Sequence, residues 1–324
     1  MSISLSKTLK EKGMDGVFAE VPCPEKLGLQ KPNQLRLFHL LVRDGKFYHA
    51  DLEKWLYRNL SRYVFSRAVL EKFKQDDDLD AAIERAIQTM RENGAADEKG
   101  IGNELGEMLI YAFLEGKLSA PKLLSRVELS TDLTKYKSVC ESIHFLSASD
   151  ENGLPFNQMV FGTSNIVGDI KDAVDNAFDA IIRIEQHSDR EIQMVEKSVL
   201  DRSFDKKDLE FISSTIIPSP KEQRNYNTAY GIFLGYTLGI NAEKHPDIEF
   251  EDLVMKKMII DIQNHAQYIV DKIIGCGLGM HSFYIYIVPF MDAESNKSEI
   301  MNRVMKGDVK CYTERAVDKH PKIW

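Results

Sequence analysis

The spacing of apolar and polar residues divides this chain into alternating helices and strands. Apolar residues at helical spacing predict helices over 51–73, 79–92, 102–116, 168–186, 189–200, 205–214, 248–275 and 297–307. Short apolar runs between polar turn residues predict strands over 122–130, 141–149, 158–166, 227–240 and 282–291. Strands interleaved with helices in this way predict an α/β fold, with a mixed sheet and helices packed on its faces.

The first third of the chain follows a different pattern. Residues 1–35 are polar and rich in turn residues, which predicts an irregular arm or a short edge element. Residues 35–50 read as two short strands joined at Asp44-Gly45, a strong hairpin signal. A segment rich in Gly, Ala and charge over 93–100 reads as a linker. We therefore expect a mainly helical region with a short hairpin over 1–95 and an α/β domain over 96–324.

Composition is typical of a globular protein. The chain has 324 residues, of which 43% are hydrophobic and 28% charged. It contains no apolar run long enough to span a membrane, and its N-terminus lacks the apolar core of a signal peptide. We therefore expect a cytoplasmic protein with no membrane association. The four cysteines are widely separated and form no C-x-x-C pair, which argues against a zinc site and for free thiols.

The charge balance limits how this chain can meet nucleic acid. The formal net charge is −8, which argues against a protein that coats nucleic acid by itself. A carboxylate-lined metal site is itself acidic, so the balance still fits a nuclease. Local basic patches or a basic partner subunit would then supply the phosphate contacts.

The segment from Gly102 to Ile182 carries the strongest functional signal. Its order of helix, three strands and helix is the core layout of the PD-(D/E)xK nucleases. Such a site needs an acid on the first helix, an acid at the second strand and an acid-x-Lys pair on the third. The carboxylates hold Mg²⁺ or Mn²⁺, which activates water and neutralises phosphate charge, and the lysine stabilises the transition state. The layout predicts a nuclease-like mixed central sheet flanked by helices.

Two of these positions have acidic candidates, three glutamates in all. Glu104 and Glu107 lie three residues apart on the first helix, and Glu141 opens the second strand. Each also has a purely structural interpretation. A first-turn acid favours the helix dipole, and an acid at a strand start is often a loop residue.

The third strand lacks the charged pair. Thr163 and Asn165 stand where the acid and the lysine belong, and neither side chain carries a charge. Asp169 and Lys171 restore an acid-x-Lys spacing about one turn into the next helix, so a migrated lysine is one solution. In the alternative, Thr163, Ser164 and Asn165 bind a phosphate at the helix N-terminus without cutting it.

The residues and the order of four segments resemble the HamA C-terminal-like domain, which belongs to the nuclease subunit of the Hachiman anti-phage defence system. The segments are GNELGEMLIYAFL, KLLSRVELS, ESIHFL and VFGTSNIVGDIKDAVDNAFDAI, and the resemblance covers roughly residues 100–290. It implies a PD-(D/E)xK-related fold and a complex with a superfamily 2 DNA helicase that releases the nuclease onto DNA. The family's strand acid falls on Glu141, where aspartate is usual, and its acid-x-Lys pair falls on Thr163 and Asn165.

Two hypotheses of function follow. The first is a metal-dependent deoxyribonuclease in which Glu104, Glu141, Asp169 and Lys171 form the catalytic site. In that site Glu104, Glu141 and Asp169 hold Mg²⁺ or Mn²⁺, and Thr163, Ser164 and Asn165 bind DNA phosphate. The second is a catalytically degenerate subunit that binds DNA or regulates the helicase without cutting. Convergence of the three carboxylates on one point favours the first, and their divergence favours the second.

Overall fold

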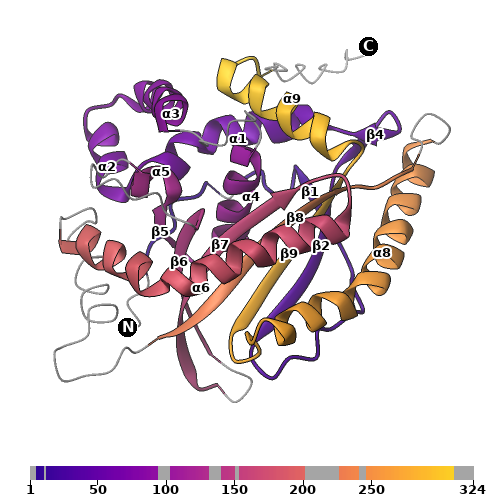
Figure 1. Ribbon diagram of the computed structural model, residues 1–324. Coiled ribbons are helices and arrows are strands. Elements are labelled where there is room, and N and C mark those ends of the chain that lie inside the picture. Colours follow the sequence, from indigo (N-terminus) through magenta and orange to yellow (C-terminus); the bar gives the residue numbers. More distant parts are fainter. Residues whose placement is uncertain are drawn as a thin grey trace, which may run out of the picture.

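A computed structural model describes residues 5–10, 12–93, 103–130, 140–149, 153–200, 226–240 and 246–309. A seven-stranded sheet runs through its centre, with helices on both faces (Figure 1). The linker expected over 93–100 lies outside the described residues apart from its first residue, and the helix expected over 205–214 lies wholly outside them. Among the described helices, none has both the length and the hydropathy needed to cross a membrane.

The sheet mixes parallel and antiparallel pairs, as the sequence predicts. Its strands lie in the order β1 (Phe18–Val21), β2 (Asn33–Leu40), β9 (Ser282–Phe290), β8 (Asn227–Thr237), β7 (Pro155–Ile166), β6 (Ser142–Ser149) and β5 (Lys122–Ser125). The four central strands, β2, β9, β8 and β7, are parallel to their neighbours in that set. The remaining pairs, at either edge, are antiparallel. The α/β fold and its mixed sheet are therefore confirmed.

Helices cover the two faces of the sheet. Helix α4 (Asn103–Gly116) packs on one face, while α6 (Ile170–Leu200) and α8 (Asp247–Gly275) cross the other (Figure 1). Helix α4 comes unusually close to β8, because a Cβ placed on Gly231 would lie 2.7 Å from the side chain of Leu114. Aromatic rings fill the layer on each side, with Phe113 against Phe233 under α4 and Phe178 against Phe283 under α6.

The long helix predicted over 51–73 is in fact two helices. Helix α1 (His49–Val64) ends at the extended residue Phe65, and α2 (Arg67–Gln75) starts after Ser66. The Ser66 side chain accepts a hydrogen bond from the backbone N–H of Val69, so a serine N-cap interrupts a continuous apolar pattern. Helices α3 (Leu79–Asn93) and α9 (Ala293–Lys306) pack against α1.

The hairpin predicted at Asp44-Gly45 is present. Strands β3 (Val42–Arg43) and β4 (Lys46–Phe47) pair antiparallel across the two residues. Both turn residues lie in the left-handed region, with φ of 54° at Asp44 and 65° at Gly45. This is the conformation that a tight two-residue hairpin turn requires.

The first 95 residues share one sheet with the rest of the chain. Strand β2 pairs in parallel with β9, so that Leu35 lies opposite Ile285. Strand β1 then adds to the outer edge of β2. The boundary expected near residue 95 therefore does not separate two sheets.

The strand predicted over 122–130 is half strand and half helix. Strand β5 ends at Ser125, and a short helix, α5 (Arg126–Ser130), follows at once. A capping box causes the switch. The backbone N–H of Glu128 donates to Ser125 Oγ at 3.3 Å, and the Glu128 carboxylate accepts from the backbone N–H of Ser125 at 2.8 Å. This places Arg126 at the first turn of a helix.

Candidate active site

Two glutamates from different elements meet beside a partly buried cation, Arg126. Glu107 lies on α4 and is 1% exposed. Glu141 directly precedes β6, and its backbone N–H donates to the carbonyl of Gly162 on β7 at 3.0 Å. The guanidinium of Arg126 lies 2.9 Å from the Glu107 carboxylate. The hydroxyl of Tyr63, at the end of α1, donates to the other oxygen of Glu107 at 2.7 Å.

Close packing of α4 on β7 brings the glutamates together. A Cβ placed on Gly106 would lie 2.2 Å from Ser164 Oγ, so only glycine allows this approach. Ser164 in turn forms hydrogen bonds to the Glu141 carboxylate through its side chain and its backbone. The Gly106–Ser164 contact therefore places the residue after Gly106, Glu107, next to the Glu141 side chain.

The environment of Glu141 favours its protonated form. Burial raises the pKa of Glu141 to about 8, with the charge of Glu107 as the second cause. Hydrogen bonds from Ser164 and the charge of Arg126 oppose this shift. The Oε2 atom of Glu141 is enclosed and has no hydrogen-bond partner among the described residues. Two adjacent carboxylates and one enclosed oxygen are a combination that a bound cation would relieve.

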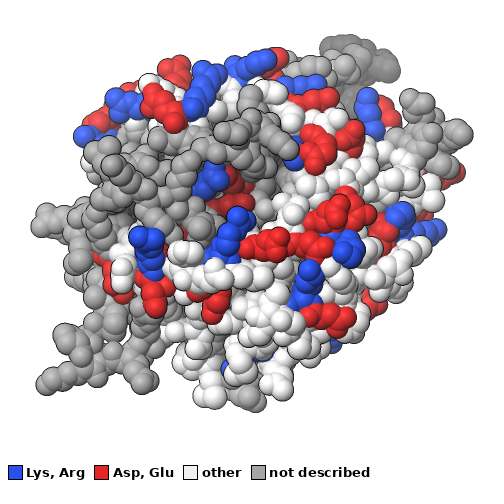
Figure 2. Space-filling model, viewed as in Figure 1, with Lys and Arg blue, Asp and Glu red and all other residues white. Residues whose placement is uncertain are grey.

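Glu141, Ser164 and Arg126 line a pocket of about 640 Å³, and Glu107 lies behind this lining. Its lining is mostly polar: Arg126, Glu141, Thr163, Ser164, Asn165, Asn176, Asp179, Ala180, Ile182 and Arg183. Basic and acidic side chains lie side by side in a hollow beside α6 (Figure 2). The lining therefore offers both carboxylates and hydrogen-bond donors to a ligand.

Alternation along β7 divides the three polar strand residues between two faces. Ser164 faces α4, as its closeness to Gly106 shows. Asn165 faces α6, where its Oδ1 accepts a hydrogen bond from Asn176 at 3.3 Å. Thr163 lies one residue before Ser164 and is 2% exposed. All three line the pocket, but only Ser164 bonds to the paired glutamates.

The other predicted residues do not line the pocket. Glu104 lies in the first turn of α4, half-buried, and its charge acts on Arg126. Asp169 instead caps α6, accepting hydrogen bonds from the backbone N–H groups of Lys171 at 2.7 Å and Asp172 at 3.2 Å. Lys171 forms an ion pair with Asp175 at 2.9 Å. Neither Asp169 nor Lys171 lines the pocket.

The three-carboxylate metal site expected from the sequence does not form. Across the part of the chain that the structure describes, no group of three His, Cys, Asp or Glu side chains is placed to hold a metal ion. Glu104, Glu141 and Asp169 are all among those residues. The arrangement that does form is a pair, Glu107 and Glu141, with Arg126 beside it.

Sequence reasoning missed Arg126 and Tyr63 and weighed Glu107 without selecting it. Tyr63 lies outside the nuclease-like core segment, so no local pattern links it to Glu107. Arg126 falls in a stretch whose apolar residues read as a strand. Its one available signal is the Ser125-x-x-Glu128 spacing, which marks a helix start and would have placed Arg126 at a strand-to-helix junction.

Comparison with known proteins identifies the family of this chain. The HamA family model matches residues 16–304. A search of curated proteins and a search of solved structures found no match. The matched range includes both glutamates, Arg126, Tyr63 and the whole described sheet. The chain therefore belongs to the HamA family, that of the Hachiman anti-phage defence system.

Proposed function

We propose that this protein is the nuclease subunit of its defence system and hydrolyses phosphodiester bonds of DNA with a divalent metal ion. One observation carries the proposal. Glu141 and Arg126 line a polar pocket that opens to solvent, and the buried Glu107 lies next to both of them. Acidic groups for a hard cation and a fixed positive charge for a phosphate are the parts that this chemistry needs.

The pair of glutamates fits Mg²⁺ or Mn²⁺. Mg²⁺ is usually bound through one or two carboxylates and completes its shell with waters and phosphate oxygens. Glu141 Oε2 is enclosed and forms no hydrogen bond to any residue that the structure describes, so it is available as a ligand. When bound, the metal supplies a more acidic water and neutralises charge on the phosphate.

Arg126 takes the place of the motif lysine in this proposal. Its guanidinium stays charged, forms an ion pair with Glu107 and lines the pocket. A guanidinium can bind two phosphate oxygens at once and stabilise charge that develops there. It cannot serve as a general base, so Arg126 would act as an electrostatic group only.

The α6 wall suits the sugar-phosphate backbone beside the cleaved bond. Arg183 is exposed on this wall, and no ion pair to it is found among the described residues. Asn176 and Asn165 add amide groups to the same pocket lining. Side-chain amides and arginines are common partners of phosphate and sugar oxygens.

A helicase partner completes the proposal. The net charge of −8 gives this chain little long-range attraction for DNA. A superfamily 2 helicase encoded beside it would bring DNA to the pocket and set when cleavage starts. Supporting evidence for this partnership is membership of the HamA family.

A non-catalytic role is the second candidate, and the pocket lining favours it. Among the described residues, no lysine lines the pocket, and Arg126 already neutralises Glu107. A subunit of this kind would hold DNA at Ser164, Asn165 and Arg183 and regulate the helicase without cutting.

A cleavage assay separates the two candidates. Plasmid and linear DNA are incubated with the full chain, with and without the neighbouring helicase and ATP, in Mg²⁺, Mn²⁺ or chelator. The nuclease proposal expects chelator-sensitive cleavage that falls at least about 100-fold in Glu107→Gln and Glu141→Gln. Lys171→Met is the matched control, because it removes a charge outside the pocket. Helicase binding with no cleavage in any condition would favour the regulatory role.

A further inference from the structure

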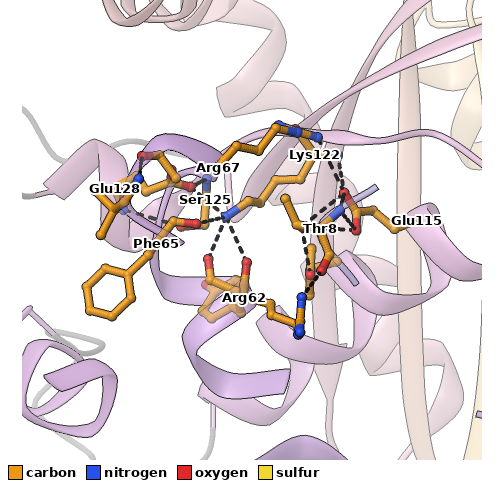
Figure 3. A network of polar contacts seen from close by, with 12 residues as sticks. Thr8, Arg62, Phe65, Arg67, Glu115, Lys122, Ser125 and Glu128 are labelled. Atoms are coloured by element: carbon orange, nitrogen blue, oxygen red, sulfur yellow. Dashed lines mark hydrogen bonds and ion pairs between the residues drawn. The ribbon is translucent and has the colours of Figure 1, made fainter. Parts of the chain in front are cut away.

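A second buried network lies beneath the candidate site and centres on Lys122 (Figure 3). The Lys122 side chain is fully buried at the start of β5. Its Nζ donates to the backbone carbonyls of Arg62, Tyr63 and Phe65 at 3.1, 2.9 and 3.0 Å. These carbonyls belong to the last turn of α1 and the residue after it, where a helix lacks partners of its own. Lys122 therefore caps the end of the helix that carries Tyr63.

The same ammonium also holds the start of α5. Lys122 Nζ lies 2.8 Å from the carboxylate of Glu128. That carboxylate accepts from the backbone N–H of Ser125, directly before Arg126. Burial lowers the pKa of Lys122, and the charge of Glu128 opposes the shift. One side chain thus joins the end of α1 to the beginning of α5.

Lys122 is itself anchored through its backbone. Its N–H donates to the carboxylate of Glu115 on α4 at 2.6 Å, and its carbonyl accepts from Arg67. Glu115 is fully buried and also accepts from the backbone N–H groups of Thr8 and Leu9. The backbone of Lys122 is therefore fixed to α4, the helix that carries Glu107.

We infer that Lys122 is a positioning residue that holds Tyr63 and Arg126 against Glu107. Tyr63 and Arg126 are the two groups that bond to opposite oxygens of the Glu107 carboxylate. Both sit at ends of elements that Lys122 joins, α1 and α5. The inference rests on the proposed function for its catalytic meaning, but the geometry that it predicts is testable without any activity.

The first test measures metal binding. Mn²⁺ is titrated into the full chain and followed by electron paramagnetic resonance, with wild type, Lys122→Met and Gln158→Met compared. Gln158 is the matched control, because it is a buried polar residue that bonds Ser282 and Tyr284, away from Glu107. We expect Lys122→Met to weaken Mn²⁺ binding about 10- to 100-fold and Gln158→Met to leave it unchanged. Equal Mn²⁺ affinity in wild type and Lys122→Met would overturn the inference.

The second test decides the inference if wild type binds no Mn²⁺, a result that would count against the proposed function alone. The melting temperatures of Lys122→Met, Tyr63→Phe and the double variant form a mutant cycle. If Lys122 positions Tyr63, the loss caused by Tyr63→Phe shrinks by about half or more in the Lys122→Met background. Additive losses would reject the positioning role.

A milder variant covers the case in which Lys122→Met does not fold. Glu128→Gln keeps the shape of the side chain and leaves the α1 carbonyls capped, but it breaks the charged link to α5. It should weaken Mn²⁺ binding less than a change at Lys122, and it should couple to Arg126→Lys in the same kind of cycle. Additive behaviour of Glu128→Gln and Arg126→Lys would again reject the inference.

Discussion

The environment of Glu141 suits a carboxylate that coordinates a metal ion better than it suits a carboxylate without one. Burial and the charge of Glu107 raise its pKa to about 8, and its Oε2 atom has no hydrogen-bond partner among the described residues. Groups with shifted pKa values in a pocket are typical of functional sites. This arrangement lowers the free energy of unfolding of the metal-free protein by an amount that depends on pH.

We predict that Glu141→Gln stabilises the metal-free protein at pH 7. The folded pKa of about 8 exceeds the ordinary value of 4.5, so the folded state holds a proton that the unfolded state releases. The contribution of Glu141 to stability is thus full below pH 4.5 and is lost as pH rises toward 8. The gain for the variant should be about 2–3 kcal/mol at pH 7, measured by urea unfolding.

Two comparisons check this prediction. Added Mn²⁺ should stabilise wild type and leave Glu141→Gln nearly unchanged, because the variant lacks one ligand. The same change at the exposed residue Glu84 on α3 serves as the control and should alter stability little. A Glu141→Gln variant less stable than wild type at pH 7 without metal would contradict the account.

His144 should produce an acid-sensitive step in stability. Burial lowers its pKa to about 3, while its Nδ1 donates to the carbonyl of Ala120 at 2.8 Å. Below pH 6.5 His144 binds a proton in the unfolded state but stays neutral in the folded state. The free energy of unfolding therefore falls as pH drops from 6.5 to 3. His144→Phe should remove about 2 kcal/mol of the loss between pH 7 and 5. Urea unfolding at both values measures it, and an unchanged loss would contradict the prediction.

At the scale of elements, the site depends on how closely α4 approaches β7. Gly106→Ala places a methyl group within 2.2 Å of Ser164 Oγ, so helix and strand must separate. We expect a loss of about 1–3 kcal/mol in unfolding free energy and weaker Mn²⁺ binding. Gly275→Ala, at the end of α8 with open space around it, is the control.

A compensating change sharpens that test. Ser164→Gly removes the side chain that the new methyl group meets, so the double variant should recover stability. Metal binding should recover less, because Ser164 also bonds to Glu141. If Ser164→Gly restores no stability to Gly106→Ala, the close contact is not the cause of the loss.

Asp169 should behave as a helix cap. Its carboxylate accepts hydrogen bonds from the backbone N–H groups of Lys171 and Asp172 in the first turn of α6. Asp169→Ala should lower the unfolding free energy by about 1 kcal/mol and leave metal binding and DNA cleavage unchanged. If Asp169→Ala still melts cooperatively but no longer cleaves DNA, Asp169 is a catalytic residue and not only a helix cap.

Local patterns along the sequence predicted most elements but not the meeting of the site residues. Periodicity located α8, β8 and β9 to within a few residues, because their apolar faces repeat regularly. It failed at Ser66 and at Ser125, where a single capping side chain changes the structure inside an apolar run. Caps act through one hydrogen bond and leave hydrophobic periodicity unchanged.

The site itself combines residues that are distant in sequence. Tyr63, Glu107, Arg126 and Glu141 come from four segments, and their meeting depends on a glycine contact and a capping box. The acid-x-Lys spacing at Asp169 and Lys171 was a local match, and the structure uses Asp169 to cap a helix. Spacing of residue types therefore did not locate the residues that meet, and the metal-dependent chemistry that it indicates stays a prediction.

At the scale of the whole molecule, the chain should not divide at residue 95. Strand β9 pairs with β2 on one side and β8 on the other, so a fragment of residues 96–324 would expose one side of a buried strand. We expect this fragment to show no cooperative melt in circular dichroism, and co-expression with residues 1–95 to restore one. A cooperative melt of the fragment alone would support two separate domains.

The two outermost strands have a consequence for self-association. Strands β1 and β5 each contain four residues, which leaves little free backbone for another strand to join. On β5, the backbone N–H and carbonyl of Lys122 are already taken by Glu115 and Arg67. Sheets that add a strand from a second copy are the usual route to amyloid-like aggregates. Such addition is therefore blocked at β5, and at β1 the free edge is short. A defence protein with these edges can then be kept at high concentration without associating through its sheet.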